Sequence, residues 1–89
     1  MDLGLKDKSV IVTAASKGIG KATALGFLQE GARVTICARD QGALDAAREE
    51  LQAATGGQIA AFVADVSDPQ QLETLVAAAT AAHGAADVL

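Results

Sequence analysis

The strongest constraint on the fold of this chain is the regular alternation of two hydrophobic patterns along it. Short, continuous apolar runs with many β-branched residues occupy residues 10–13, 33–38 and 59–64. Such runs are typical of strands that a parallel sheet buries on both faces. After each run, apolar residues recur every three or four positions, as on one face of an amphipathic helix. The alternation predicts an α/β fold with a doubly wound parallel sheet and right-handed crossovers.

Capping signals indicate where the expected helices begin and end. We expect helices over about residues 21–30, 41–54 and 69–82. Gly31 suits a left-handed C-cap after the first helix, and Asp40 can cap the start of the second. The third helix has three start signals together: Asp68 as N-cap, Pro69 at the first helical position, and Gln71 three residues after the cap.

Composition narrows the class of protein. With 89 residues the chain has room for one domain, and its 51% hydrophobic content is too high for disorder. A net charge of −4 gives no overall attraction to nucleic acid or to an anionic membrane, so any anion site must be local. No run approaches the roughly 18 apolar residues of a membrane span. The lone cysteine, Cys37, fits a reducing compartment, so we expect a soluble cytoplasmic domain.

A glycine-bearing segment joins the first expected strand to the first expected helix. It reads Thr-Ala-Ala-Ser-Lys-Gly-Ile-Gly over residues 13–20. The first N–H groups of a helix lack partners within the helix and lie at its positive dipole end, which favours a diphosphate. The candidate binding residues in this segment are Ser16, Lys17, Gly18, Ile19 and Gly20.

Each residue of this segment has an expected role. Gly18 removes the Cβ that would hold a phosphate away, and Gly20 lets the helix start lie close to the strand. We expect the amide of Ile19 to face the phosphate and its side chain to turn into the core. Ser16 offers a hydroxyl to a ribose or phosphate oxygen. The alternative is a tight turn without a ligand, although the position inside a strand–helix–strand unit favours the dinucleotide site of a Rossmann-type fold.

The end of the second expected strand bears on which dinucleotide would bind. Ala38 is small and Arg39 follows it, so a 2′-phosphate has both space and a guanidinium partner. Lys17 adds a second cation. Asp40 is the counter-signal, because a carboxylate at this place can bind the 2′-hydroxyl of NAD, although it can equally cap the next helix. The pattern favours NADP(H), with NAD(H) as the alternative.

These residues resemble the short-chain dehydrogenase/reductase family. The family loop is Thr-Gly-x-x-x-Gly-x-Gly, and here Ala14 replaces its first glycine. The resemblance implies that the basic residues Lys17 and Arg39 go with NADP(H). It also implies that Asp65 accepts from the adenine amino group and that Val66 lines the adenine pocket. Taken without the resemblance, Asp65 could be a capping carboxylate. The opening of the chain is similar to members called 3-oxoacyl-carrier-protein reductases.

The resemblance further implies a function for the chain and the extent of its domain. It points to an NADP(H)-dependent oxidoreductase that reduces a carbonyl or oxidises an alcohol. Residues 1–89 would be a partial dinucleotide-binding domain in the order β-α-β-α-β-α-β, cut at a fourth strand that opens at residues 87–89. The family's proton donor is a tyrosine, and this chain has none, so we expect it to hold no catalytic residue and to be inactive alone.

Two further expectations concern partners and unused residues. A first strand without its fourth-strand neighbour would expose an apolar edge, which predicts association through that edge or a homo-oligomer. The alternative function is a non-catalytic nucleotide-binding or partner-docking module. His83 has no ligand-spaced partner for a metal and is expected to be a surface residue, whereas Cys37 is expected to be buried and inert.

Overall fold

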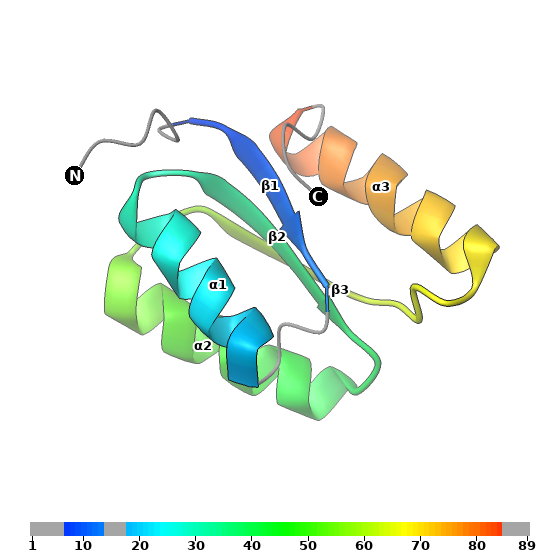
Figure 1. Ribbon diagram of the computed structural model, residues 1–89, viewed down its shortest axis with the longest axis horizontal. Helices are drawn as coiled ribbons and strands as arrows, with labels where there is room; N and C mark the ends of the chain where they lie inside the picture. The colour runs from blue at the N-terminus through cyan, green and yellow to red at the C-terminus, as the bar shows by residue number, and fades with distance from the viewer. Residues whose placement is uncertain (1–6, 14–17, 85–89) are drawn as a thin grey trace.

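The computed structural model describes residues 7–13 and 18–84. In this part of the chain strands and helices alternate, as Figure 1 shows. The elements are β1 (Ser9–Val12), α1 (Gly18–Gln29), β2 (Arg33–Ala38), α2 (Gln41–Thr55), β3 (Ile59–Val63) and α3 (Pro69–His83). The predicted α/β alternation is therefore confirmed for these elements. The expected fourth strand at residues 87–89 lies outside the described residues.

The strands form a parallel sheet in the order β1-β2-β3. In the register between β1 and β2, Val10 lies opposite Val34 and Val12 opposite Ile36. Between β2 and β3, Val34 pairs with Ile59. Parallel neighbours in sequence order require crossover connections, and each crossover here is a helix. All three strands consequently end at the same edge of the sheet.

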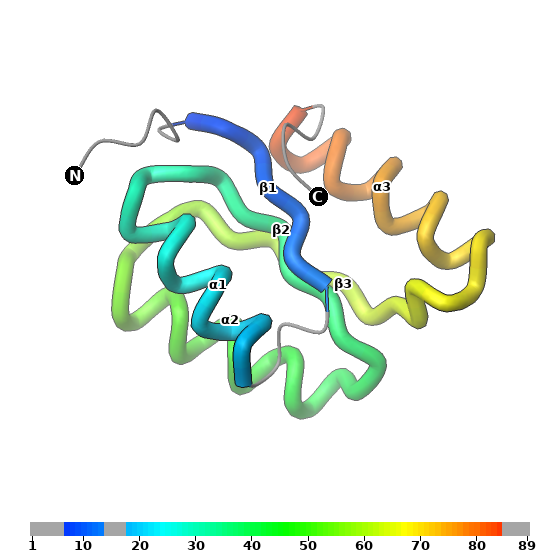
Figure 2. Tube along the Cα trace, in the orientation of Figure 1, coloured from blue at the N-terminus to red at the C-terminus, as the bar shows by residue number. Residues whose placement is uncertain are grey.

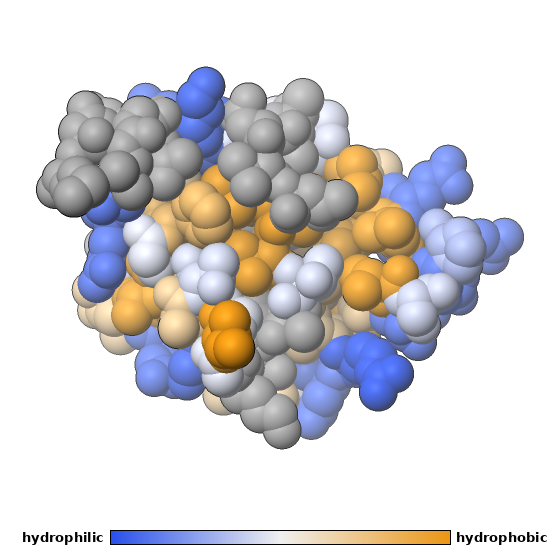
Figure 3. Space-filling model, in the orientation of Figure 1, coloured by the Kyte–Doolittle hydropathy of each residue, from blue (hydrophilic) through white to orange (hydrophobic). Residues whose placement is uncertain are grey.

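Helices cover both faces of the sheet, as the tube in Figure 2 makes plain: α1 and α2 lie on one side and α3 on the other. The alternation of side chains along each strand divides the core accordingly. On the α1 and α2 side, Val34, Ile36 and Leu44 belong to one buried cluster. On the α3 side a smaller cluster contains Ile11 and Leu75. Figure 3 shows apolar side chains gathered in the middle of the visible face, with hydrophilic ones around its margin.

The predicted N-caps of α2 and α3 and the predicted glycine C-cap of α1 are present. Asp40 accepts a hydrogen bond from the Gly42 amide at 3.0 Å, and Asp68 accepts one from the Gln70 amide at 3.0 Å. Gly31, after α1, has a φ of 85°. Its amide donates to the Leu28 carbonyl at 3.0 Å. The backbone of this glycine therefore closes the last turn in the left-handed conformation that other residues rarely adopt.

Two sequence expectations about the helices are wrong. Helix α1 begins at Gly18, three residues before the expected start at Lys21, so both glycines of the motif belong to its first turn. His83 is buried, not on the surface, with 9% of its area exposed in the last turn of α3. The cause lies in packing, because the C-terminal end of α3 lies against β1 and β2. The Ser9 hydroxyl donates to the Gly84 carbonyl at 3.5 Å, and His83 bonds the Val34 backbone.

Candidate functional site

The candidate site lies at the edge where the parallel strands end. Ala38, the last residue of β2, is paired with Val63, the last residue of β3. The amide of Ala64 continues this pairing by donating to the Ala38 carbonyl at 3.1 Å. The residues that follow each strand are therefore brought side by side. Ligands of open α/β sheets bind at this carboxyl edge, so it is the place to look for the predicted site residues.

The first turn of α1 borders the carboxyl edge. Gly18 has a φ of 63°, a conformation that favours glycine, and a Cβ built on it would meet no heavy atom within 4 Å. The described protein therefore leaves open space beside this backbone. Gly18 and Gly20 both lie in the turn whose amides lack helical partners, which suits an anion. Ser16 and Lys17, the other candidates in this segment, lie outside the described residues.

The expectation for Ile19 is wrong. Its side chain is 87% exposed and does not turn into the core. The early start of α1 places Ile19 in the second position of the helix. No described element packs over the side of the first turn on which Ile19 lies. Its amide still belongs to the first turn. An exposed aliphatic side chain next to a candidate anion site provides an apolar surface for a ligand to contact.

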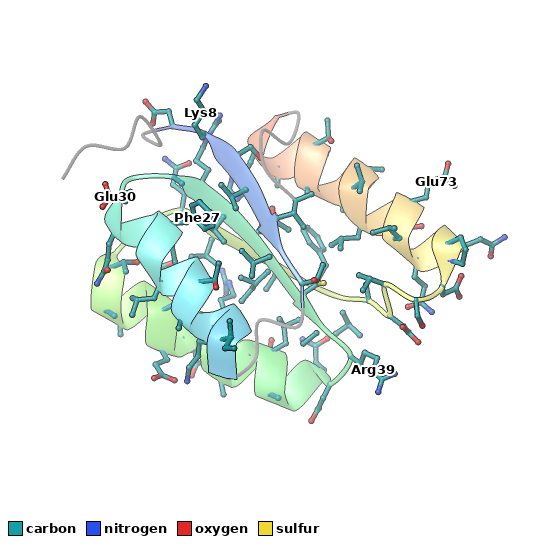
Figure 4. All side chains as sticks on the ribbon, in the orientation of Figure 1. Lys8, Phe27, Glu30, Arg39 and Glu73 are labelled. Carbon is teal, nitrogen blue, oxygen red and sulfur yellow. The ribbon has the colours of Figure 1, made fainter. Side chains whose placement is uncertain are left out.

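Arg39 and Asp65 face each other across the ends of β2 and β3. The Arg39 Nη1 atom lies 3.8 Å from the Asp65 Oδ2 atom, which is an ion-pair distance but not a hydrogen bond. The Arg39 side chain is 79% exposed and that of Asp65 36% exposed. Figure 4 shows Arg39 at the turn between β2 and α2 with its side chain directed away from the sheet. A guanidinium held this loosely is available to an external anion.

Asp65 is held by the loop between β3 and α3. Its Oδ1 atom accepts from the Ser67 amide at 3.0 Å and from the Ser67 hydroxyl at 2.6 Å. These hydrogen bonds hold the pKa of the Asp65 carboxyl below its ordinary value of 3.8, and the Arg39 guanidinium lowers this pKa further. The next residue, Val66, is half-buried and packs against the cluster on the α3 side of the sheet. Asp65 is therefore a fixed, ionised acceptor at neutral pH.

The cap on α2 bears on the choice between the two dinucleotides. Asp40 follows Arg39 and was the residue that could have bound a ribose 2′-hydroxyl. Its Oδ1 atom instead accepts from the Gly42 amide, and its backbone is extended as an N-cap requires. One oxygen of this carboxylate is engaged in starting α2, as the capping interpretation predicts, and Arg39 is the cation presented beside it at the end of β2.

An ion pair that the sequence did not predict joins α1 to α2. Lys21 Nζ lies 2.7 Å from Glu50 Oε2. Beside it, a hollow of about 210 Å³ between the two helices is lined partly by Gly18 and Leu25. No local spacing could have indicated the ion pair, because Lys21 and Glu50 stand 29 positions apart and meet only through helix packing.

Comparison with known proteins identifies the family. Residues 8–89 match the family model described as short chain dehydrogenase. The chain belongs to the short-chain dehydrogenase family. A glucose 1-dehydrogenase of Gluconobacter oxydans is 44% identical over 82 residues, which are 92% of this chain and 31% of that protein.

Solved short-chain dehydrogenase structures have the same fold. The L-sorbose reductase of Gluconobacter frateurii, solved in complex with NADPH and L-sorbose, superimposes with a TM-score of 0.93 at 32% identity. The match covers 99% of this chain and 34% of that one. An NADPH-bound short chain oxidoreductase of Pseudomonas aeruginosa with an atypical catalytic center gives a TM-score of 0.91 at 36% identity, over 94% of this chain and 34% of that one.

These matches set the scope of the identification. The chain spans about a third of the length of the glucose 1-dehydrogenase and of the L-sorbose reductase. They confirm the short-chain dehydrogenase family and the Rossmann-type fold. The finer resemblance to 3-oxoacyl-carrier-protein reductases stays a prediction. Among the described residues, no helix has the length and hydrophobicity to cross a bilayer.

Proposed function

We propose that this chain is the cofactor-binding part of an NADP(H)-dependent oxidoreductase that interconverts a carbonyl and an alcohol. The observation that carries the proposal is the position of Arg39. It stands exposed at the end of β2, beside Asp65 and across the carboxyl edge from the glycine turn of α1. The edge therefore combines an open backbone for a diphosphate, a cation for a 2′-phosphate and a fixed carboxylate for the adenine.

Each part of the cofactor has candidate partners in this chain. The turn that holds Gly18, Ile19 and Gly20, with Ser16 and Lys17 before it, would hold the diphosphate through backbone amides. Arg39 would bind the 2′-phosphate. Asp65 and Val66 would hold the adenine. When bound, NADP(H) supplies the hydride, whereas this chain binds and orients the adenosine half.

The rest of the reaction requires residues from elsewhere. This chain has no tyrosine to move a proton to or from the substrate oxygen. We therefore infer that it binds cofactor without catalysing the reaction and that the substrate pocket is built by other residues. The relatives include proteins named for glucose and L-sorbose, which makes small polyhydroxy carbonyl compounds a reasonable first panel of substrates.

Equilibrium titration tests the cofactor assignment. We expect the protein to bind NADPH more tightly than NADH, because Arg39 gains a charge-assisted hydrogen bond only with the 2′-phosphate. In Arg39→Asp, we expect NADPH affinity to fall by about 1.5–3 kcal/mol, with a much smaller change for NADH. Isothermal titration calorimetry measures both affinities, because its signal does not depend on how the nicotinamide end of the cofactor is held.

A second arginine provides the matched control. Arg48 lies exposed on α2, and Arg48→Asp makes the same change of net charge away from the strand ends. We expect Arg48→Asp to leave the preference for NADPH unchanged. Tighter binding of NADH by the unmodified protein, or equal losses in the two variants, would contradict the assignment of Arg39.

A further inference from the structure

The loop after β3 engages nearly every polar group of Asp65. The Asp65 amide donates to Gln71 Oε1 at 2.7 Å. The Asp65 carbonyl accepts from the Asp68 amide at 3.1 Å. Its Oδ1 atom accepts both hydrogen bonds from Ser67. Hydrogen bonds therefore hold the backbone amide and carbonyl of Asp65 and one of its two carboxylate oxygens.

The remaining oxygen, Oδ2, is left without a hydrogen bond in the described part of the chain. The cation within ion-pair distance of it is Arg39, whose Nη1 atom at 3.8 Å is too far to donate. The Asp65 side chain is 36% exposed at the carboxyl edge. An ionised carboxylate oxygen in this position can accept from an external N–H donor without breaking any bond of the loop.

Gln71 links this arrangement to α3. Its side-chain oxygen accepts from the Asp65 amide, and its side-chain nitrogen donates to Asp68 Oδ2 at 3.2 Å. A glutamine at this helical position commonly accepts from the amide of the N-cap residue. Here the Asp68 amide is already taken by the Asp65 carbonyl, so Gln71 reaches the residue at the end of the strand instead. The first turn of α3 thereby holds the backbone of Asp65.

We propose that Ser67 and Gln71 are positioning residues that orient Asp65, so that its Oδ2 atom accepts from the exocyclic amino group of the cofactor adenine. Ser67 binds the Oδ1 atom and so leaves the Oδ2 atom to accept from the cofactor. Gln71 binds the backbone amide of Asp65 and so fixes the position of the residue that carries the carboxylate. This inference rests on the proposed function, because it assigns two residues to the adenine end of that site. Neither residue would itself touch the cofactor.

Ligands that differ only at the adenine amino group isolate this contact. We would compare NADPH with an analogue that carries hydrogen at position 6 of the purine. We expect the unmodified protein to prefer NADPH by about 10-fold, the scale of a hydrogen bond to a charged group. In Ser67→Ala, the carboxylate loses the hydroxyl that fixes it, and we expect the preference to fall to about 3-fold or less. Ser67→Thr keeps the hydroxyl and should retain the preference.

Matched controls lie on the same helix. Thr80→Ala removes a hydroxyl that bonds the Val76 carbonyl within α3, far from the loop, and should leave the preference unchanged. Gln71→Ala should reduce the preference, whereas Gln70→Ala, at the exposed neighbouring position, should not. In an Asp65→Asn background, Ser67→Ala should cause no further loss, because the residue on which it acts has changed.

A readout without cofactor tests the positioning directly. Because the Ser67 hydrogen bonds are what most lower the pKa of Asp65, Ser67→Ala should raise that pKa, and Thr80→Ala should not. Carbon-detected NMR of the Asp65 carboxyl measures the change. If NADPH binds but the unmodified protein does not distinguish the 6-amino group, or if Ser67→Ala keeps the full preference, the inference is wrong while the proposed function stands. If NADPH itself does not bind, the proposed function fails.

Discussion

At the scale of single residues, Ile19 and His83 show why exposure is hard to predict. The sequence placed the aliphatic Ile19 inside and the polar His83 outside, and the structure has both the other way round. Hydropathy indicates what a residue favours, but the exposed area depends on which elements pack over it. The candidate site was more predictable. Arg39 could be assigned from its position just after a strand, because parallel strands bring their carboxyl ends together. The roles of Asp65 and Val66 followed only from the family resemblance, and they stay predictions.

The burial of His83 predicts a pH-dependent stability. Burial lowers its pKa from the ordinary value of 6.5, and the nearby Arg33 guanidinium lowers it further, while a hydrogen bond to the Val34 backbone opposes them. Because the unfolded chain then binds a proton more readily than the folded one, stability falls as the pH drops below about 6.5. Chemical unfolding at pH 7.5 and pH 5 measures the loss.

The histidine can be tested by replacing it. His83 is the one histidine of the chain, so no other imidazole titrates over this range. We expect the stability of His83→Gln to change less between the two pH values than that of the unmodified protein. An equal pH dependence in both proteins would refute the role of His83.

At the scale of elements, the sequence predicted β2 without error and the other two described strands, β1 and β3, to within one residue at each end. Continuous apolar runs give strong strand signals, and Asp40 and Asp68 fix the starts of α2 and α3 through their own side chains. The start of α1 was missed because Gly18 and Gly20 have poor helix propensity. Tertiary contacts of Ala24 and Leu28 with the sheet cluster outweigh that propensity.

Substitutions at two glycines with open surroundings distinguish the effect of backbone conformation on stability from that of side-chain packing. Gly56 ends α2 with a φ of 64°, whereas Gly26 lies within α1, and no heavy atom is within 4 Å of a Cβ built at either. We expect Gly56→Ala to destabilise the fold by about 1–2 kcal/mol, the cost of a left-handed conformation with a side chain. Gly26→Ala should stabilise it by about 0.5–1 kcal/mol. Denaturant unfolding compares them, and changes of the same sign would contradict this account.

At the scale of the whole molecule, β2 is the central strand of the described sheet. It pairs with β1 on one side and with β3 on the other, and side chains of both core clusters extend from it. The strand order agrees with the tendency of sequential strands to lie side by side, although the connection rules also permit other orders of a doubly wound sheet. The separation of the core into a larger and a smaller cluster could not be predicted, because it depends on how each helix lies against the strands.

The central position of β2 predicts an order of folding. We expect Ile36→Val in β2 to slow refolding, because β1 and β3 can join the sheet only through this strand. Leu75→Ala, in the smaller cluster under α3, should destabilise by about 2–5 kcal/mol and mainly speed unfolding. Stopped-flow folding and unfolding in urea separates the rates. A larger effect of Leu75→Ala on refolding than on unfolding would reverse the proposed order.

The meeting of three chain segments at the carboxyl edge has a thermodynamic consequence. The turn of α1, the end of β2 and the loop after β3 contribute one surface, although they are distant in sequence. A small molecule that contacts all three segments would stabilise the folded sheet, because it binds the folded state and not the unfolded one. Saturation at about 100 times the dissociation constant would add about 2.7 kcal/mol to the unfolding free energy, which is a sizeable gain against the roughly 5–15 kcal/mol that typically stabilises a folded protein.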